Sequence, residues 1–142
     1  MPDRRGFVDS NVVCYLFGAD PAKAERAETL LAKKPVISVQ VLAEVCNVAS
    51  RKSRRTWDEI EEIITTLCAV CEVVPLTQAV QASARAIAAL TGYTIYDAQI
   101  LAAAAKAGCA IVWSEDMQHG HRLTVCNVEL EIHNPFGGGD HD

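Results

Sequence analysis

The sequence has no long apolar run, few aromatic residues and no excess of positive charge. Its apolar runs are far shorter than the roughly 18 residues that a membrane-spanning helix needs. Residues 1–10, MPDRRGFVDS, lack the apolar stretch of a signal peptide. The net charge of −5 argues against a protein that binds nucleic acid simply because it is basic. We therefore expect a cytoplasmic protein without a membrane segment, in which any contact with nucleic acid is local.

The cysteines and glycines also fail to form familiar motifs. The six cysteines lie mostly within apolar periodic segments, where a reduced thiol packs as a small apolar group, so no disulfide framework is expected. Cys68 and Cys71 resemble half of a zinc knuckle, but no second Cys or His pair has a suitable spacing. The glycines are scattered and form no phosphate-binding loop, which argues against a nucleotide-binding module.

Short apolar segments alternate with helical patterns along the 142-residue chain, half of which is hydrophobic. The segments that read as buried strands are 6–9, 35–38, 72–76 and 110–114. The segments that read as helices are 10–17, 19–34, a stretch beginning after Ser38, 57–70, 77–90 and 94–108. Residues 122–136 read as one last edge strand. We predict an α/β fold with a single domain at 1–136, a central, mostly parallel sheet covered by helices on both faces, and a polar, Gly-rich tail at 137–142.

Four carboxylates fall where this fold would bring them together. Asp9 follows the first strand, Glu44 lies in the helix after the second strand, Asp97 begins the helix before the fourth strand, and Asp116 follows that strand. Helices that cover a parallel sheet begin at the carboxyl edge of its strands, where ligands usually bind. Converging carboxylates repel one another unless a cation separates them, and oxygen ligands suit Mg²⁺ or Mn²⁺. We infer hydrolysis of a phosphodiester, in which one ion activates a water and a second stabilises the leaving oxygen.

Each acid also has a purely structural explanation. Asp9 could cap the helix that follows it, and Asp97 lies three residues after Thr94, as in a capping box. Glu44 could be a solvated helix residue, although its neighbours are apolar and an unpaired buried carboxylate is costly. Asp116 could form a turn. These explanations predict acids placed independently around the domain, whereas a shared site requires all of them at one edge.

The segments that contain the acids resemble the motifs of the PIN-domain family, and more narrowly the VapC-like ribonuclease toxins of type II toxin–antitoxin pairs. FVDSNV resembles the first motif, VLAEV the second, IYDAQILAAA the third and WSEDMQHG the fourth, and the closing HNPF is similar to the end of many VapC-like chains. The resemblance covers nearly the whole chain. It implies a metal-dependent endoribonuclease in which Asp9, Glu44, Asp97 and Asp116 hold one or two Mg²⁺ or Mn²⁺ ions, with Asp9 and Asp97 as the main direct ligands.

The resemblance further implies supporting residues and partners. Asn11 and Ser114 would orient the carboxylates. The partners would be an RNA substrate, a VapB-like antitoxin protein and a second copy of the chain in a homodimer. His119 and His121 flank a glycine, and we expect them at the surface rather than as general bases.

A basic cluster, RKSRR at residues 51–55, lies between two predicted helices. It could be an ordinary solvated loop, or its Arg51, Lys52, Arg54 and Arg55 could bind RNA phosphates near a site that repels them. No aromatic platform for bases stands out, because Trp57, Trp113 and Tyr96 are scattered along the chain.

Two other functions remain open at this point. A receiver-like signalling domain has a similar size and an acidic Mg²⁺ pocket, but it requires paired acids after its first strand and a lysine after its last core strand. Here GFVDS has one acid and WSEDMQHG has no lysine. A PIN-fold module that only binds RNA would not need four intact acids. Nuclease activity therefore remains the favoured prediction.

Overall fold

The computed structural model describes residues 5–137. Every strand and helix predicted between residues 6 and 114 is present, although the helix predicted at 10–17 is divided into an α-helix and a 3₁₀-helix, η1. No helix in this part of the chain is both long and apolar enough to cross a bilayer. The elements are β1 (Phe7–Val8), α1 (Ser10–Val13), η1 (Cys14–Phe17), α2 (Pro21–Leu31), β2 (Val36–Ser38), α3 (Val39–Arg51), α4 (Trp57–Val70), β3 (Glu72–Val74), α5 (Gln78–Thr91), α6 (Ile95–Lys106), β4 (Ile111–Trp113), β5 (Arg122–Val125) and β6 (Val128–His133).

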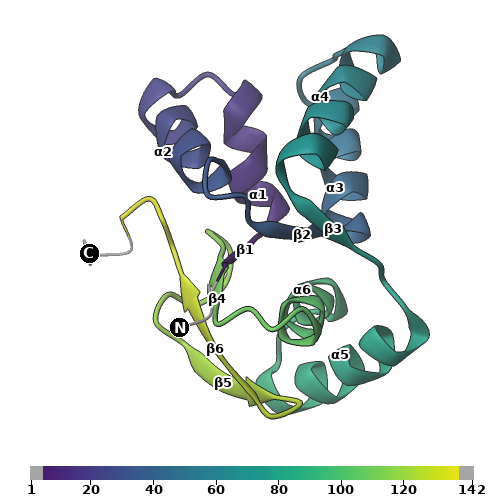
Figure 1. Ribbon diagram of the computed structural model, residues 1–142, viewed down its shortest axis with the longest axis vertical. Coiled ribbons are helices and arrows are strands. Elements are labelled where there is room, and N and C mark those ends of the chain that lie inside the picture. The colour runs from purple at the N-terminus through teal and green to yellow at the C-terminus, as the bar shows by residue number, and fades with distance from the viewer. Residues whose placement is uncertain (1–4, 138–142) are drawn as a thin grey trace.

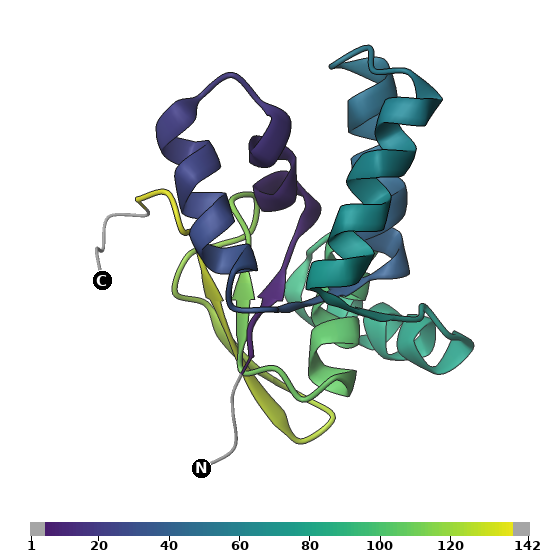
Figure 2. The ribbon, with the colours of Figure 1, turned by 45° about the horizontal axis from the view of Figure 1, so that its top comes forward.

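The strands form one sheet in the order β3-β2-β1-β4-β6-β5. All neighbouring strands are parallel except β5 and β6, which are antiparallel. The predicted α/β fold with a mostly parallel sheet is therefore confirmed. Figure 1 shows the chain entering the sheet at β1 and closing it with the β5–β6 hairpin, and β1, β4 and β6 lie side by side in Figure 2.

The prediction of a single edge strand at residues 122–136 is wrong. This segment makes two strands, of which β6 pairs in parallel with β4 inside the sheet and β5 lies at the edge. The reversal depends on Cys126 and Asn127, which both have positive φ angles of 50° and 67°. A two-residue hairpin turn of this kind is normally marked by Asn-Gly or Asp-Gly, and no glycine marks it here.

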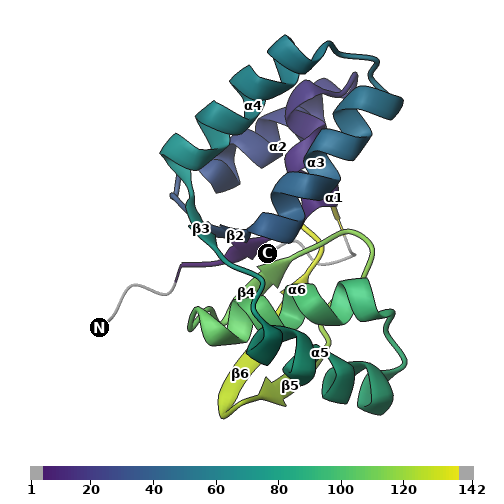
Figure 3. The ribbon, with the colours of Figure 1, turned by 90° about the vertical axis from the view of Figure 1, so that its right-hand side faces the viewer.

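Helices cover the two faces of the sheet. Figure 3 shows α1 to α4 on one side of β1–β3 and α5 and α6 on the other. The central strands are accordingly mostly apolar, with Phe7, Val8, Ile37 and Val112 fully buried. On the second side α6 contacts β2, β4, β5 and β6. Its buried residues, Ala98–Ala105, include five alanines whose small side chains let the helix pack closely against the sheet.

The carboxyl ends of β1, β2 and β4 lie together because these strands are parallel neighbours. Phe7 is in register with Val36 and Val112. The backbone N–H of Asp9 continues the pairing by donating to the carbonyl of Trp113 at 2.9 Å. This edge of the sheet positions the candidate site. The tail predicted at 137–142 lies outside the described residues except for Gly137, so that boundary stays a prediction.

Candidate functional site

The four acids, Asp9, Glu44, Asp97 and Asp116, come from separate elements but influence one another electrostatically. Burial, together with the negative charges of Glu44 and Asp97, raises the pKa of Asp9 to about 7. Burial also raises the pKa of Asp97, to which Asp116 and Glu44 add their repulsion. The structure therefore brings these acids into one region, as the topology predicts, rather than distributing them around the domain.

Asp9 is the most enclosed of the acids, with 3% of its surface exposed. Its Oδ1 accepts a hydrogen bond from the Ser10 backbone N–H at 2.7 Å. Its Oδ2 accepts from the Ser114 hydroxyl at 2.9 Å and from Asn11 Nδ2 at 3.2 Å. The bonds from Ser10 and Ser114 favour the ionised carboxylate and lower its pKa, but desolvation outweighs them. Within residues 5–137, Asp9 is therefore a carboxylate that forms no ion pair with a Lys or Arg.

Asn11 and Ser114, which the family resemblance singles out, attach the loop after β4 to the start of α1. The Ser114 hydroxyl, fully buried, accepts from Asn11 Nδ2 at 3.3 Å and from the Asp116 backbone N–H at 3.3 Å. Asn11 Oδ1 accepts from the Glu115 N–H at 3.0 Å. Both side chains thus contact Asp9 and also hold the loop that carries Asp116.

Glu44 is fixed at both carboxylate oxygens. Oε1 accepts from the Ser10 hydroxyl at 2.7 Å, and Oε2 accepts from Gln40 Nε2 at 2.9 Å. A freely solvated glutamate would not be held in this way. Ser10 thus bonds Asp9 through its backbone and Glu44 through its hydroxyl, which joins two of the four acids through one residue.

Asp97 and Asp116 differ from these two acids, because neither carboxylate takes part in a hydrogen bond or ion pair within residues 5–137. Thr94 caps α6 by accepting from the Asp97 N–H at 3.1 Å, but the Asp97 carboxylate does not bond back to Thr94. In the capping box of α4, by contrast, both bonds between Thr56 and Glu59 are present. The capping explanation therefore does not account for the Asp97 carboxylate.

The chemistry of the four acids suits a hard divalent cation. Their donor atoms are all carboxylate oxygens, and no Lys or Arg among the described residues pairs with them. In the described part of the chain, however, no three His, Cys, Asp or Glu side chains are arranged as a ready-made metal site. Mg²⁺ keeps several waters and commonly needs only one or two direct carboxylates. The unbonded carboxylates of Asp97 and Asp116 therefore fit such an ion by their chemistry, without forming a closed cage.

The two histidines near the fourth motif are half-buried rather than free on the surface. His119 Nδ1 accepts from the Asn134 N–H at 2.9 Å. His121 Nδ1 lies 2.7 Å from the Tyr93 hydroxyl. Burial raises the pKa of Tyr93, and the charge of Asp97 contributes to this rise. These bonds attach the loop after β4 to Asn134, just past the end of β6, and to Tyr93, between α5 and α6, which gives both histidines a structural task.

The basic cluster at residues 51–55 is divided by the fold. The Arg55 guanidinium lies 5.3 Å from the centre of the Phe17 ring and donates to the Phe17 carbonyl at 3.4 Å. Arg55 is therefore partly buried against η1, whereas Arg51, Lys52 and Arg54 are exposed. The RNA-binding role stays a prediction, and the structure favours the three exposed residues for it.

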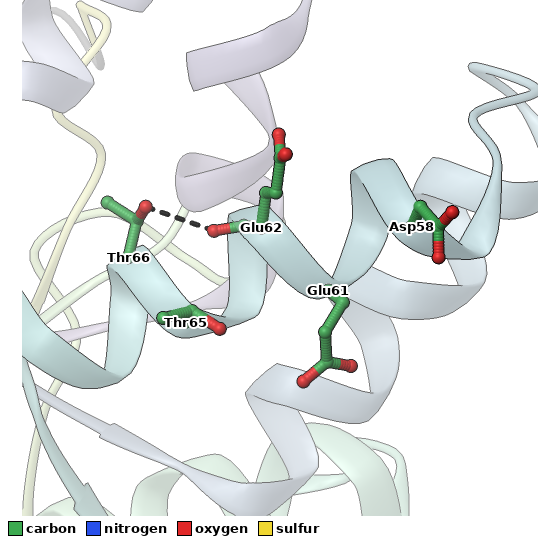
Figure 4. A pocket seen from close by; sticks show the side chains of 5 residues that line it. All are labelled: Asp58, Glu61, Glu62, Thr65 and Thr66. Carbon is green, nitrogen blue, oxygen red and sulfur yellow. Dashed lines mark hydrogen bonds between the residues drawn. The ribbon is translucent and has the colours of Figure 1, made fainter.

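An open hollow lies along the exposed side of α4, apart from the four acids. Figure 4 shows its lining residues, all from that helix: Asp58, Glu61, Glu62, Thr65 and Thr66. Thr66 donates to the Glu62 carbonyl at 3.0 Å, one turn back along the helix. Its carboxylates would repel RNA phosphates, so it is a negatively charged helix surface rather than a candidate RNA site.

Sequence reasoning missed Gln40 and Gln99, which are two of the few buried polar residues. They are 9% and 8% exposed, respectively, and Gln40 contacts Glu44 directly. The available signal was their position: each is an amide within an otherwise apolar helical segment, and buried amides require partners. That signal indicates a polar contact but not the residue contacted.

Comparison with known proteins identifies relatives of this fold. The family model described as PIN domain matches residues 6–121. No curated protein sequence matches the chain. Among solved structures, VapC20 of Mycobacterium tuberculosis, described as a sarcin–ricin loop cleaving toxin, is similar with a TM-score of 0.65 and 23% identity over 78% of this chain and 89% of that one.

Two further solved structures are similar to this chain. A toxin–antitoxin complex from Klebsiella pneumoniae matches with a TM-score of 0.63 and 17% identity over 78% of this chain and 86% of that one. FitAcB from Neisseria gonorrhoeae matches with a TM-score of 0.61 and 15% identity over 93% and 99% of the two chains. At these identities the structural similarity establishes the fold.

Proposed function

The chain belongs to the PIN domain family, and from this membership and its four acids we propose that it is a metal-dependent endoribonuclease, the toxin of a type II toxin–antitoxin pair. The observation that carries the proposal is the mutual repulsion of Asp9, Glu44 and Asp97, joined by Asp116, without a Lys or Arg partner among the described residues. Crowded carboxylates do not stabilise the fold by themselves. They do bind a divalent cation, which explains why they lie together.

In this proposal the four acids divide into direct metal ligands and supporting residues. Asp9 and Asp97 are the main direct ligands, and Glu44 and Asp116 complete the site or hold its waters. Asn11 and Ser114 orient Asp9 through the bonds described above. A bound Mg²⁺ or Mn²⁺, as one or two ions, would supply a water of lowered pKa and a counter-charge for the leaving oxygen.

The substrate and partners follow from the family resemblance and from the relatives. VapC20 is described as cleaving the sarcin–ricin loop, an RNA, and the K. pneumoniae relative as a toxin–antitoxin complex. For this chain we propose an RNA substrate, a VapB-like antitoxin partner, a homodimer and a cytoplasmic location. Its place in the PIN family removes the receiver-like alternative. The remaining rival is a PIN-fold module that binds RNA without cutting it.

The test is RNA cleavage by the purified protein with Mg²⁺ or Mn²⁺, with and without EDTA. We expect cleavage to need the metal and to be lost in Asp97→Asn, which removes charge from an unbonded carboxylate and keeps its shape. Asp58→Asn is the matched control, because Asp58 lies in the hollow on α4, and it should cleave like the parent. Undiminished cleavage in EDTA would refute the metal mechanism, and RNA binding without cleavage would favour the rival.

A further inference from the structure

Two buried glutamines, Gln40 in α3 and Gln99 in α6, form a hydrogen-bonded pair that contacts Glu44, one of the four acids. They are 9% and 8% exposed. Gln99 Nε2 donates to Gln40 Oε1 at 2.8 Å. A buried amide costs free energy unless its donors and acceptor are paired. The burial of these two polar side chains is therefore explained by the groups that they contact.

The bonds of Gln40 leave only one orientation for its amide. Its Nε2 donates to Glu44 Oε2 at 2.9 Å and to the Tyr96 carbonyl at 3.1 Å. Both of these partners accept, and an amide nitrogen has two hydrogens to give. Turning the amide over would place its oxygen against two acceptors and its nitrogen against the Gln99 donor. Glu44 and the Tyr96 carbonyl thus determine which atom of Gln40 faces Glu44, and Gln99 supports this orientation by donating to the Gln40 oxygen.

This arrangement connects the two helices that carry Glu44 and Asp97. The carbonyl that Gln40 contacts belongs to Tyr96, which immediately precedes Asp97 in the first turn of α6. The charges of Glu44 and Asp97 repel each other. A neutral amide can hold Glu44 against this repulsion without cancelling the negative charge that would attract a cation, as a lysine or arginine in its place would do.

We propose that Gln40 is a positioning residue, which fixes the Glu44 carboxylate relative to Asp97, and that Gln99 acts through Gln40 by donating to its amide oxygen and so holding the amide in place. The inference deepens the proposed function, and its metal-binding consequence rests on that function. The network itself rests only on the hydrogen bonds and burial given above. Residues that orient metal ligands typically change metal affinity by about 10- to 100-fold when they are lost.

The experiment measures Mn²⁺ binding to the whole chain without RNA, by the electron paramagnetic resonance signal of free Mn²⁺. Gln40→Met and Gln99→Met keep the side-chain length and remove the amide. Each should weaken Mn²⁺ binding by about 10-fold or more. Gln78→Met, at an exposed position of α5, is the matched control and should bind like the parent. Equal dissociation constants in the folded variants and the parent would overturn the positioning role.

The double variant, Gln40→Met with Gln99→Met, separates this role from general damage to the core. If Gln99 acts through Gln40, the double variant should bind Mn²⁺ no more weakly than Gln40→Met alone. Additive losses would contradict the proposed order of action. Thermal unfolding of every variant shows whether a loss of affinity follows a loss of folding.

A second measurement keeps the network testable if the parent binds no Mn²⁺, a result that would refute the proposed function by itself. Hydrogen exchange of the Gln40 side-chain amide is followed by nuclear magnetic resonance in metal-free buffer. The amide should be protected in the parent and in Gln78→Met, and exposed to exchange in Gln99→Met. Rapid exchange in the parent, or unchanged protection in Gln99→Met, would refute the network.

Discussion

Replacing Asp9 with asparagine should make the metal-free protein more stable at neutral pH. Asp9 is almost completely buried, and desolvation, aided by repulsion from Glu44 and Asp97, raises its pKa from 3.8 to about 7. Ionising it in the folded state therefore costs free energy that the unfolded chain does not lose. Asparagine has nearly the same shape and no charge.

The pH dependence follows from this direction of the shift. Below pH 3.8 the carboxyl group is protonated in both states and contributes nothing. As the pH rises toward 7, the unfolded chain releases the proton while the folded chain retains it, so stability is lost over that interval. At pH 7.5 the difference between 3.8 and about 7 corresponds to a cost of about 4 kcal/mol.

The substitution also has a cost of its own. The oxygen of an asparagine at position 9 can still accept the bond from the Ser10 backbone N–H. Its amide nitrogen then takes the place of Asp9 Oδ2, facing Ser114 and Asn11, which donate to that oxygen in the parent. The loss amounts to about 2 kcal/mol. The net gain is about 2 kcal/mol at pH 7.5, or about 6 °C in melting temperature for a domain of this size. At pH 5 the gain should fall close to zero.

Thermal unfolding of the parent and Asp9→Asn in EDTA, from pH 5 to 8, measures this difference, and effects of other titrating groups largely cancel between the two proteins. Saturating Mn²⁺ should then reverse the order, because a ligand at about 100 times its dissociation constant stabilises the parent by about 2.7 kcal/mol. A variant that is clearly less stable than the parent at pH 7.5 in EDTA would show that Asp9 serves mainly as a cap for α1, and would refute the electrostatic reasoning.

Two further predictions concern the partners. Arg54→Ala should weaken RNA binding and reduce the slope of log affinity against log salt by about 0.7, the value for one phosphate contact on a single strand. Arg55→Ala should chiefly lower the melting temperature, because Arg55 packs on Phe17. Equal salt slopes for Arg54→Ala and the parent would show that Arg54 does not contact RNA phosphates. Expression of the chain alone should halt bacterial growth, and co-expression of its antitoxin should restore growth, because an arginine or lysine of the partner can bind between the four acids in place of a metal ion. If Asp97→Asn were as toxic as the parent, the four acids would not be the cause of the toxicity.

The fold was predictable because its signals are local and agree with one another. Apolar strands alternate with capped helices, and this pattern admits few arrangements other than a covered parallel sheet. The β5–β6 hairpin was not predictable in the same way. Its turn places Cys126 and Asn127 at positive φ angles, and a cysteine gives no sequence signal for that conformation.

The position of the four acids was predictable from topology, but their bonding was not. Parallel strands fix which residues reach the carboxyl edge. They do not determine that Ser10 bonds both Asp9 and Glu44, or that Gln40 reaches Glu44. The basic cluster illustrates the same limit, because five adjacent residues read as one surface while Arg55 turns back onto Phe17.

Two helix starts in this chain show why a local motif cannot decide between a structural and a functional acid. Thr56 and Thr94 are each followed, three residues later, by an acid, and each threonine caps its helix. Glu59 bonds back to the Thr56 backbone at 2.9 Å, whereas Asp97, one methylene shorter, makes no such bond. Asp97 instead lies where Asp116 and Glu44 repel it. The local pattern is shared, so only the fold, which brings Glu44 and Asp116 from other elements close to Asp97, distinguishes the capping residue from the candidate ligand.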